Sequence, residues 1–275
     1  MIEVRKLKKR FGANQVLDGV SFRIEKGESV VIIGRSGGGK SVLLKLLIGL
    51  LKPEAGAVLI QGEDIVPMNE RELLRVRRKF GMLFQGAALF DSMTVAENVA
   101  FAFRRDHSLS EGEVARRVGE VLEMVDLPGT QAQNPSELSG GMRKRVGLAR
   151  AIIYQPEIVL YDEPTTGLDP IVADSIDRLI LRVRDRLDVT TVVVTHEMRS
   201  ARRLGQRILM LHEQKIYATG TAEEIFRSAD PVVRRFIDGV SEDKGAATGP
   251  PGGDSAKAQQ QGGAGILSPS LARQP

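Results

Sequence analysis

Uninterrupted apolar runs mark three segments of the chain, at residues 29–33, 158–161 and 191–195. Each run has the length of a strand and is rich in valine and isoleucine, which is typical of a parallel strand buried on both faces. Between the last two runs, residues 170–187 carry apolar side chains at a helical period. This alternation of strand, helix and strand predicts an α/β fold whose mostly parallel sheet is covered on both faces.

The N-terminal part has a different pattern. Residues 2–7 and 16–25 alternate between apolar and polar positions, which predicts edge strands of antiparallel character. The pair Asp18-Gly19 is a turn signal, so the second of these strands is expected to be interrupted there. Residues 57–61 predict one more strand, which ends at a glycine.

The segment 88–155 contains no strand-like apolar run and predicts a helical subdomain inserted into the α/β domain. Residues 110–113 have the form of a capping box and open one of its helices. A second helix is marked by Met142, Val146, Ala149 and Ile153. It must end before Pro156, because proline cannot continue a helix. Further along the chain, Asp169 is the expected N-cap of the helix that begins at Pro170.

Two short helices are predicted near the C-terminal end, with starts at Thr221 and at Asp230. Beyond Ser241 the sequence consists mainly of Gly, Pro, Ala, Gln and Ser. Such a composition cannot bury a core, so the segment is expected to be disordered. The predicted organisation is therefore one α/β domain over 1–240 and a disordered tail over 241–275.

Composition narrows the class of protein. The chain has 275 residues, a net charge of +4 and no cysteine, which excludes disulfides and cysteine-based metal sites. The first residues lack the apolar core of a signal peptide. No apolar stretch approaches the roughly 20 residues needed to span a bilayer. The basic clusters, including Arg143–Arg145, are interpreted as solvated helix faces, with contact to anionic lipid head groups or a partner as the weaker alternative.

Candidate chemistry begins with residues 34–41, whose spacing G-x-x-x-x-G-K-[ST] predicts a phosphate-binding loop. The strand at 29–33 precedes it and the apolar residues 42–47 start a helix behind it, so backbone N–H groups and the helix dipole favour an anion. Lys40 is expected to reach the β- and γ-phosphates, and the Ser41 hydroxyl to hold Mg²⁺. The nucleotide-binding residues of this loop are Gly34, Arg35, Ser36, Gly37, Gly38, Gly39, Lys40 and Ser41.

A pair of carboxylates, Asp162-Glu163, follows the apolar run at 158–161. The carboxyl ends of parallel strands share one edge of a sheet, so these side chains are expected beside the phosphate loop. Asp162 is suited to bind Mg²⁺ directly or through water. Glu163 is suited to orient the water that attacks the γ-phosphate and to accept its proton.

The motif Leu138-Ser139-Gly140-Gly141-Met142 lies between these two elements, inside the predicted helical insertion. Alone it predicts no more than a helix cap. In this order of motifs it resembles the signature, usually written LSGGQ, of the ATP-binding-cassette (ABC) family. The resemblance covers about residues 1–240 and implies a P-loop NTPase (RecA-like) cassette that hydrolyses ATP with Mg²⁺.

The resemblance also implies roles for other residues. Phe11 matches the aromatic residue that stacks on adenine, with Val16 nearby. Gln85 matches the glutamine that touches Mg²⁺ and water and senses the membrane partner. Residues 167–169 match the loop that crosses to the other subunit. His196 matches the histidine that contacts the γ-phosphate.

Members of the family work as dimers in which each ATP lies between one subunit's phosphate loop and the other's signature helix. Ser139, Gly140 and Gly141 are therefore implied to bind the nucleotide of the second subunit. Met142 stands where the family usually has glutamine, and no role is assigned to its side chain. A single cassette without a membrane span implies separate membrane permease subunits and a peripheral position on the cytoplasmic face of the inner membrane.

Within the family, residues 84–95 look like the ATPases of Mla/Mce-type systems, which carry phospholipids or other hydrophobic molecules between bacterial membranes. Residues 41–45, Met142 and residues 235–240 are similar to that subfamily too. This implies Mce-type substrate-binding and small STAS-type partner subunits. Leu89 and Phe90 are expected to be partly exposed, in a groove that receives a short permease helix.

Three alternatives remain. Polar amino-acid importers share much of this architecture. Soluble cassette ATPases that act on DNA or ribosomes usually carry two cassettes, long coiled coils or zinc modules, which this sequence lacks, so no nucleic acid partner is expected. A regulatory switch without turnover is opposed by the presence of both Glu163 and His196.

Overall fold

The computed structural model describes residues 1–105 and 109–240 of the chain. The strands are β1 (Ile2–Phe11), β2 (Asn14–Ile24), β3 (Ser29–Ile33), β4 (Ala55–Ile60), β5 (Glu63–Asp64), β6 (Phe80–Leu83), β7 (Ile158–Asp162), β8 (Thr190–Thr195), β9 (Arg207–His212) and β10 (Lys215–Thr221). The helices are α1 (Lys40–Leu47), α2 (Glu70–Arg77), α3 (Val95–Ala100), η1 (Phe101–Arg105), α4 (Glu111–Met124), η2 (Pro135–Glu137), α5 (Gly140–Ile152), α6 (Pro170–Leu187), α7 (Met198–Leu204), α8 (Ala222–Arg227) and α9 (Pro231–Asp238).

The three apolar runs form the centre of a six-stranded sheet with the order β10-β9-β3-β8-β7-β6. Strands β6, β7, β8, β3 and β9 pair in parallel, and β10 adds an antiparallel edge. Alternate residues of the central strands enter two different apolar clusters: Val31 and Ile33 lie in one, Val30 and Ile32 in the other. The sheet is therefore covered on both faces, which confirms the predicted fold class.

A second sheet has the order β2-β1-β4-β5 and is antiparallel throughout. The predicted interruption of β2 at Asp18-Gly19 is wrong, because β2 runs through both residues and the hairpin turns at residues 12–13. Gly19 has φ of 74°. The β1–β2 register shifts nearby, so this turn signal marks an irregularity inside the strand instead of its end.

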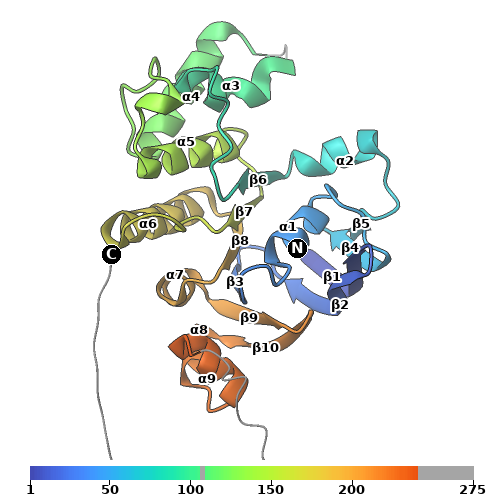
Figure 1. The fold of residues 1–275 in the computed structure, drawn as a ribbon. Helices are drawn as coiled ribbons and strands as arrows, with labels where there is room; N and C mark the ends of the chain where they lie inside the picture. The colour runs from blue at the N-terminus through green and yellow to red at the C-terminus, as the bar shows by residue number, and fades with distance from the viewer. Residues whose placement is uncertain (106–108, 241–275) are drawn as a thin grey trace, which may run out of the picture. The chain divides into compact units, whose positions relative to one another are not determined.

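The segment predicted to be helical contains α3, η1, α4, η2 and α5, which lie together in Figure 1. Ser110 caps α4 by accepting a hydrogen bond from the Glu113 amide. Helix α5 packs against β6, and it ends at Ile152, before Pro156 as predicted. A helix from the insertion thereby lies directly against the parallel sheet, which places its side chains within reach of the strand ends.

Helix α6 begins as expected, because the Asp169 carboxylate accepts hydrogen bonds from the amides of Ile171 and Val172, with Pro170 in the first turn. Thr221 and Asp230 cap α8 and α9 in the same way. Residues 1–240 form one compact unit. The prediction of a disordered tail at 241–275 falls outside the described residues. Within the described ranges, no helix is both long and apolar enough to cross a membrane.

Candidate active site

The loop between β3 and α1 has the shape that phosphate binding requires. The Gly38 amide donates to the Arg35 carbonyl at 3.0 Å, and a Cβ on Gly38 would lie 2.9 Å from that oxygen. Gly39 has φ of 96°, and a Cβ there would lie 2.9 Å from Val16 Cγ1. The N-cap residue of α1 is Gly39, which has no side chain to bond the amides of the first turn. Its amides therefore remain free to bind an anion.

Lys40 occupies the centre of this loop. Its side chain is 5% exposed, and its ammonium donates to the carbonyls of Gly34 at 2.8 Å and Arg35 at 3.1 Å. The same Nζ lies 3.2 Å from Glu163 Oε1. A buried cation is thus held inside the loop, ion-paired with one of the two predicted carboxylates.

The sheet edge brings the carboxylates to the loop, as the sequence predicts. The Ser41 hydroxyl donates to Asp162 Oδ1 at 2.7 Å. Burial raises the pKa of Asp162 above its ordinary value; the Ser41 hydrogen bond opposes this effect and the neighbouring charge of Glu163 adds to it. A hydroxyl–carboxylate pair of half-buried Ser41 and buried Asp162, beside a phosphate loop, fits Mg²⁺, which is usually held by one or two carboxylates together with substrate phosphates.

Glu163 is held at both oxygens. Oε1 faces Lys40, while Oε2 lies 2.9 Å from His196 Nδ1 and accepts from the Thr166 hydroxyl at 3.1 Å. Burial opposes the charge, yet the His196 hydrogen bond and the Lys40 ammonium keep the pKa of Glu163 below its usual value. Its φ is 47°, a left-handed conformation that is costly for a residue with a side chain. The carboxylate is therefore ionised and fixed in direction.

Gln85 follows β6 and is exposed. Its backbone carbonyl accepts a hydrogen bond from Lys144, but no hydrogen bond joins its side chain to Ser41 or Asp162 among the described residues. The structure thus brings the backbone of Gln85 to the site, and its predicted contact with Mg²⁺ stays a prediction.

The signature residues form the N-terminal end of α5 and pack against α6 and the residue Leu168 before it. The Ser139 hydroxyl accepts from the Met142 amide at 3.3 Å and caps α5. Gly141 packs so closely on α6 that a Cβ would lie 2.6 Å from Val172 Cγ1. Across the described residues, no hydrogen bond or ion pair links Ser139, Gly140 or Gly141 to Gly34 or to residues 36–41.

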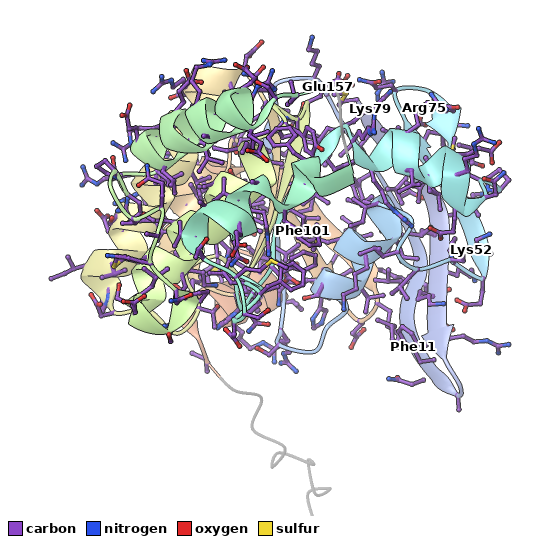
Figure 2. The ribbon with its side chains drawn as sticks, turned by 90° about the horizontal axis from the view of Figure 1, so that it is seen from above. Phe11, Lys52, Arg75, Lys79, Phe101 and Glu157 are labelled. Atoms are coloured by element: carbon purple, nitrogen blue, oxygen red, sulfur yellow. The ribbon has the colours of Figure 1, made fainter. Side chains whose placement is uncertain are left out.

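Val16 and Phe11 differ in their placement. Val16 packs beside Gly39, at the phosphate loop. Phe11 lies at the end of the β1–β2 hairpin and is 48% exposed, with the Lys9 ammonium 5.0 Å from its ring centre (Figure 2). An exposed aromatic face is available for stacking on a base. The role of Phe11 in stacking on adenine stays a prediction.

Two cations of α5 were not predicted as site residues. Lys144 is 6% exposed and donates to the carbonyls of Gln85 and Glu163. Arg150 donates at 2.7 Å to the carbonyls of both Ala87 and Ala88. The interpretation of the cluster Arg143–Arg145 as a solvated helix face is therefore wrong for Lys144. The sequence holds no signal for this burial, because the helical period places Lys144 opposite the apolar face of Met142, Val146, Ala149 and Ile153.

Comparison with known proteins decides the family. The sequence profile described as "ABC transporter" matches residues 17–166. The chain belongs to the ABC transporter family. It is 42% identical to the probable ribonucleotide transport ATP-binding protein mkl of Mycobacterium leprae, over 90% of this chain and 73% of that protein. It is 40% identical to the intermembrane phospholipid transport system ATP-binding protein MlaF of Haemophilus influenzae, over 88% of this chain and 92% of that protein.

Solved ABC cassettes have the same fold. A dimeric structure of the cassette MJ0796 in a post-hydrolysis state with ADP and Pi matches with a TM-score of 0.74 and 33% identity, over 81% of this chain and 99% of that one. The cbiO1 protein of Clostridium perfringens matches with a TM-score of 0.76 and 26% identity, over 85% and 93%. This ABC cassette binds ATP and is an ATP hydrolase.

A buried carboxylate near the site makes stability depend on pH. Asp177 of α6 is 3% exposed and accepts from the Ser200 hydroxyl, while its other oxygen has no hydrogen-bond partner among the described residues. Burial raises the pKa of Asp177 to about 6; Arg203 opposes the shift, and Glu197 and Asp174 add to it. The fold therefore loses stability as the pH rises from about 4 through 6 and the carboxylate ionises.

We expect Asp177→Asn to be more stable than wild type at pH 8 by about 2–3 kcal/mol, because the amide stays neutral. The difference should vanish near pH 4, where the native acid is protonated as well. Urea unfolding at several pH values measures both effects. Asp185→Asn, on the same helix but exposed and paired with Arg184, serves as control and should show no such gain. A pH-independent difference for Asp177→Asn would contradict the raised pKa.

Proposed function

We propose that this chain powers the movement of phospholipid or a related hydrophobic substrate between bacterial membranes, through separate permease and Mce-type subunits. The observation that carries the proposal is the match to MlaF over 92% of that protein's length. A second relative supports it: the chloroplastic protein TRIGALACTOSYLDIACYLGLYCEROL 3 of Arabidopsis thaliana is 41% identical over 87% of this chain. Small STAS-type subunits are further proposed partners, and nucleic acid is not.

The site geometry supports a specific division of labour in hydrolysis. Residues 34–41 bind the phosphates, and Lys40 leaves Glu163 for them because they carry more negative charge. Since His196 and Thr166 hold Oε2, the oxygen released is Oε1. Oε1 then orients the attacking water and accepts its proton, while His196 is placed to contact the γ-phosphate.

We propose that Ser41 and Asp162 hold Mg²⁺, with Gln85 as an added contact. The metal supplies charge neutralisation between the β- and γ-phosphates. The described residues contain no cluster of three His, Cys, Asp or Glu side chains that could bind a metal by themselves. The site therefore fits an ion that arrives with the nucleotide and takes its remaining ligands from phosphate and water.

The hydrogen bonding of the signature is compatible with a homodimer. Among the described residues Ser139, Gly140 and Gly141 make no hydrogen bond or ion pair with Gly34 or residues 36–41 of their own chain, and we propose that they bind the ATP of a second copy, with Phe11 and Val16 on the adenine side. The N-terminus of α5 is a further anion-binding position. The similar cassette MJ0796 is itself dimeric.

An apolar groove fits the proposed permease contact. It has a volume of about 720 Å³ and is lined by residues that include Leu74, Met82, Phe84, Phe90, Phe101 and Tyr154. Phe90 is 41% exposed, and its ring centre lies 4.5 Å from that of Phe101, which is labelled in Figure 2. Leu89 is half-buried. The expectation that both residues are partly exposed is confirmed.

The backbone of Phe90 is fixed independently of its side chain. Its amide donates to Asn98 Oδ1 at 2.8 Å, and its carbonyl accepts from Asn98 Nδ2 at 3.1 Å. The ring is therefore presented to the groove by a rigid turn. Apolar anchors presented in this way are typical of sites that bind a partner helix.

We expect Phe90→Asp to fold and to bind ATP with an affinity within about threefold of wild type, because an exposed carboxylate carries little desolvation cost. Co-purification with the membrane permease should be lost, together with lipid movement. Val240→Asp places the same charge on an exposed apolar residue outside the groove and should retain the permease. Retention of the permease by Phe90→Asp would remove the groove from the proposed interface.

The transported substrate is tested with the ATPase and its co-purified membrane subunits reconstituted in proteoliposomes. The proposal predicts ATP-dependent movement of labelled phospholipid between membranes, abolished by Glu163→Gln. The sulfate/thiosulfate import protein CysA of Bordetella parapertussis is also 40% identical to this chain. ATP-driven uptake of a polar solute without lipid movement would therefore assign the chain to polar-substrate import instead.

A further inference from the structure

Lys144 is a buried cation that joins three parts of the molecule. It lies on α5, five residues after the signature serine, and its ammonium donates to the carbonyl of Gln85 after β6 and to that of Glu163 after β7, the latter at 3.2 Å. Its side chain is 6% exposed. One side chain therefore connects the helix with the backbone on both sides of the catalytic edge.

Holding an ammonium in this place is costly. Burial lowers the pKa of Lys144, and the charges of Asp162, Glu163 and Glu197 oppose the shift. Among the described residues no carboxylate forms an ion pair with it, so its hydrogen bonds go to backbone carbonyls. A buried charge is tolerated only where its acceptors are well placed. An apolar side chain of the same length would fill this space without the cost of burying a charge. The ammonium group of Lys144 therefore has a role beyond packing.

The carbonyl of Glu163 is a sensitive point for such a contact. Glu163 has a left-handed φ of 47°, and its amide donates to the Val194 carbonyl at 2.9 Å. The strand β8 thus holds the amide side of the residue and Lys144 holds the carbonyl side. Together they fix a strained backbone whose rotation would swing the carboxylate away from the phosphate loop.

The segment after Gln85 is held by the same helix. Ala87 and Ala88 both have positive φ, at 61° and 48°, and their carbonyls accept from Arg150. Helix α5 therefore controls this segment at two points, through Lys144 and Arg150. A shift of α5 along its axis would move the carbonyl positions of Gln85 and Glu163 together.

We propose that Lys144 is a positioning residue, which aligns the Glu163 carboxylate for hydrolysis and makes that alignment depend on the placement of α5. The inference rests on the proposed function, in which the N-terminus of α5 contacts the ATP of a second copy. Nucleotide bound there would fix α5, and Lys144 would pass its position to the chain's own Glu163. The two ATP sites of the dimer are then coupled through this side chain.

The test compares full-length wild type, Lys144→Met and Lys144→Gln, with the exposed Lys52→Met as a matched control (Lys52 is labelled in Figure 2). Lys144→Met should bind ATP within about threefold of wild type but turn over on the order of 10- to 100-fold more slowly at saturating ATP, the size of loss that a misplacement of about 1 Å produces. The cooperativity with which the hydrolysis rate depends on ATP concentration should fall as well. Lys144→Gln keeps an N–H donor and should recover several-fold of the lost turnover.

Each other outcome overturns the inference. If Lys144→Met kept the turnover and the cooperativity of wild type, the inference about Lys144 would be wrong, and the proposed function would be unaffected. Equal losses in ATP affinity and turnover, or loss of the folded state in both variants by thermal unfolding, would assign Lys144 to stability alone. An absence of ATP hydrolysis in wild type would overturn the proposed function and this inference with it. If Lys52→Met lowered the turnover as much as Lys144→Met, the loss of any lysine would be enough to slow hydrolysis, and the effect would not be specific to Lys144.

Discussion

Glu163→Gln is expected to lower the turnover number for ATP hydrolysis by roughly 10²- to 10⁴-fold, the usual contribution of a general base. The amide has the shape of the carboxylate and can still contact His196 and Thr166, so the local structure should persist. What is lost is the charge at Oε1, where the water is proposed to lie. Steady-state hydrolysis with a saturating concentration of Mg-ATP measures the effect.

The ATP affinity of Glu163→Gln should be equal to that of wild type or higher, for a reason that the structure provides. In the wild-type chain the Lys40 ammonium lies 3.2 Å from Glu163 Oε1 and must leave it to reach phosphate. The neutral amide holds Lys40 less strongly, so a competing contact is weakened. The trapped nucleotide should favour the dimer, which gel filtration with ATP detects.

Glu197→Gln is the matched control, because it makes the same chemical change beside His196 without touching Lys40 or Thr166. It should retain most of the wild-type turnover. A turnover number for Glu163→Gln equal to that of wild type would remove Glu163 from its proposed role. A loss of ATP binding equal to the loss of turnover would indicate a folding defect in place of a missing base.

Much of the fold could be predicted because the central strands are buried on both faces. Strands β3, β7 and β8 read as continuous apolar runs for that reason. Strand β6 was missed, since it has four residues and includes Gly81. A Cβ on Gly81 would lie 2.3 Å from the Ala151 carbonyl of α5. The glycine that weakens the strand signal is therefore required by tertiary packing.

Three further strands were missed for different reasons. Strand β5 has only two residues. Strand β10 lies at the edge of the sheet and alternates half-buried and exposed residues over seven positions, so local propensity alone could not identify it. Strand β9 does carry a local signal, a buried apolar run at residues 208–211. The turn signal at Asp18-Gly19 misled because a glycine with positive φ also suits an irregular strand.

The residues of the site also fall into two groups, those that local sequence could predict and those that only the fold identifies. The phosphate loop and Asp162-Glu163 could be predicted because each is a contiguous motif next to a strand. Lys144 could not, since its acceptors are backbone carbonyls 59 and 19 residues away, and carbonyls leave no trace in the sequence. Its neighbours Arg143 and Arg145 made the lysine look like part of a solvated face. Burial, which only the fold supplies, separates it from them.

Lys40→Ala is expected to weaken ATP binding by roughly 10- to 150-fold. The side chain is placed to give a charge-assisted contact to the β- and γ-phosphates worth roughly 1.5–3 kcal/mol. Because Lys40 is 5% exposed and donates to the carbonyls of Gly34 and Arg35, its loss also removes two bonds that shape the loop. The loop amides remain, so binding should be weakened without being abolished.

Thermal unfolding with and without Mg-ATP tests this prediction, since a ligand at ~1,000 times its dissociation constant stabilises the folded state by about 4 kcal/mol. At that ATP concentration wild type should show a large upward shift and Lys40→Ala a much smaller one. Lys45→Ala removes an exposed lysine from the same helix and should shift like wild type. A full shift in Lys40→Ala would exclude the phosphate contact. No shift in a correctly folded wild type would mean that residues 34–41 do not bind ATP.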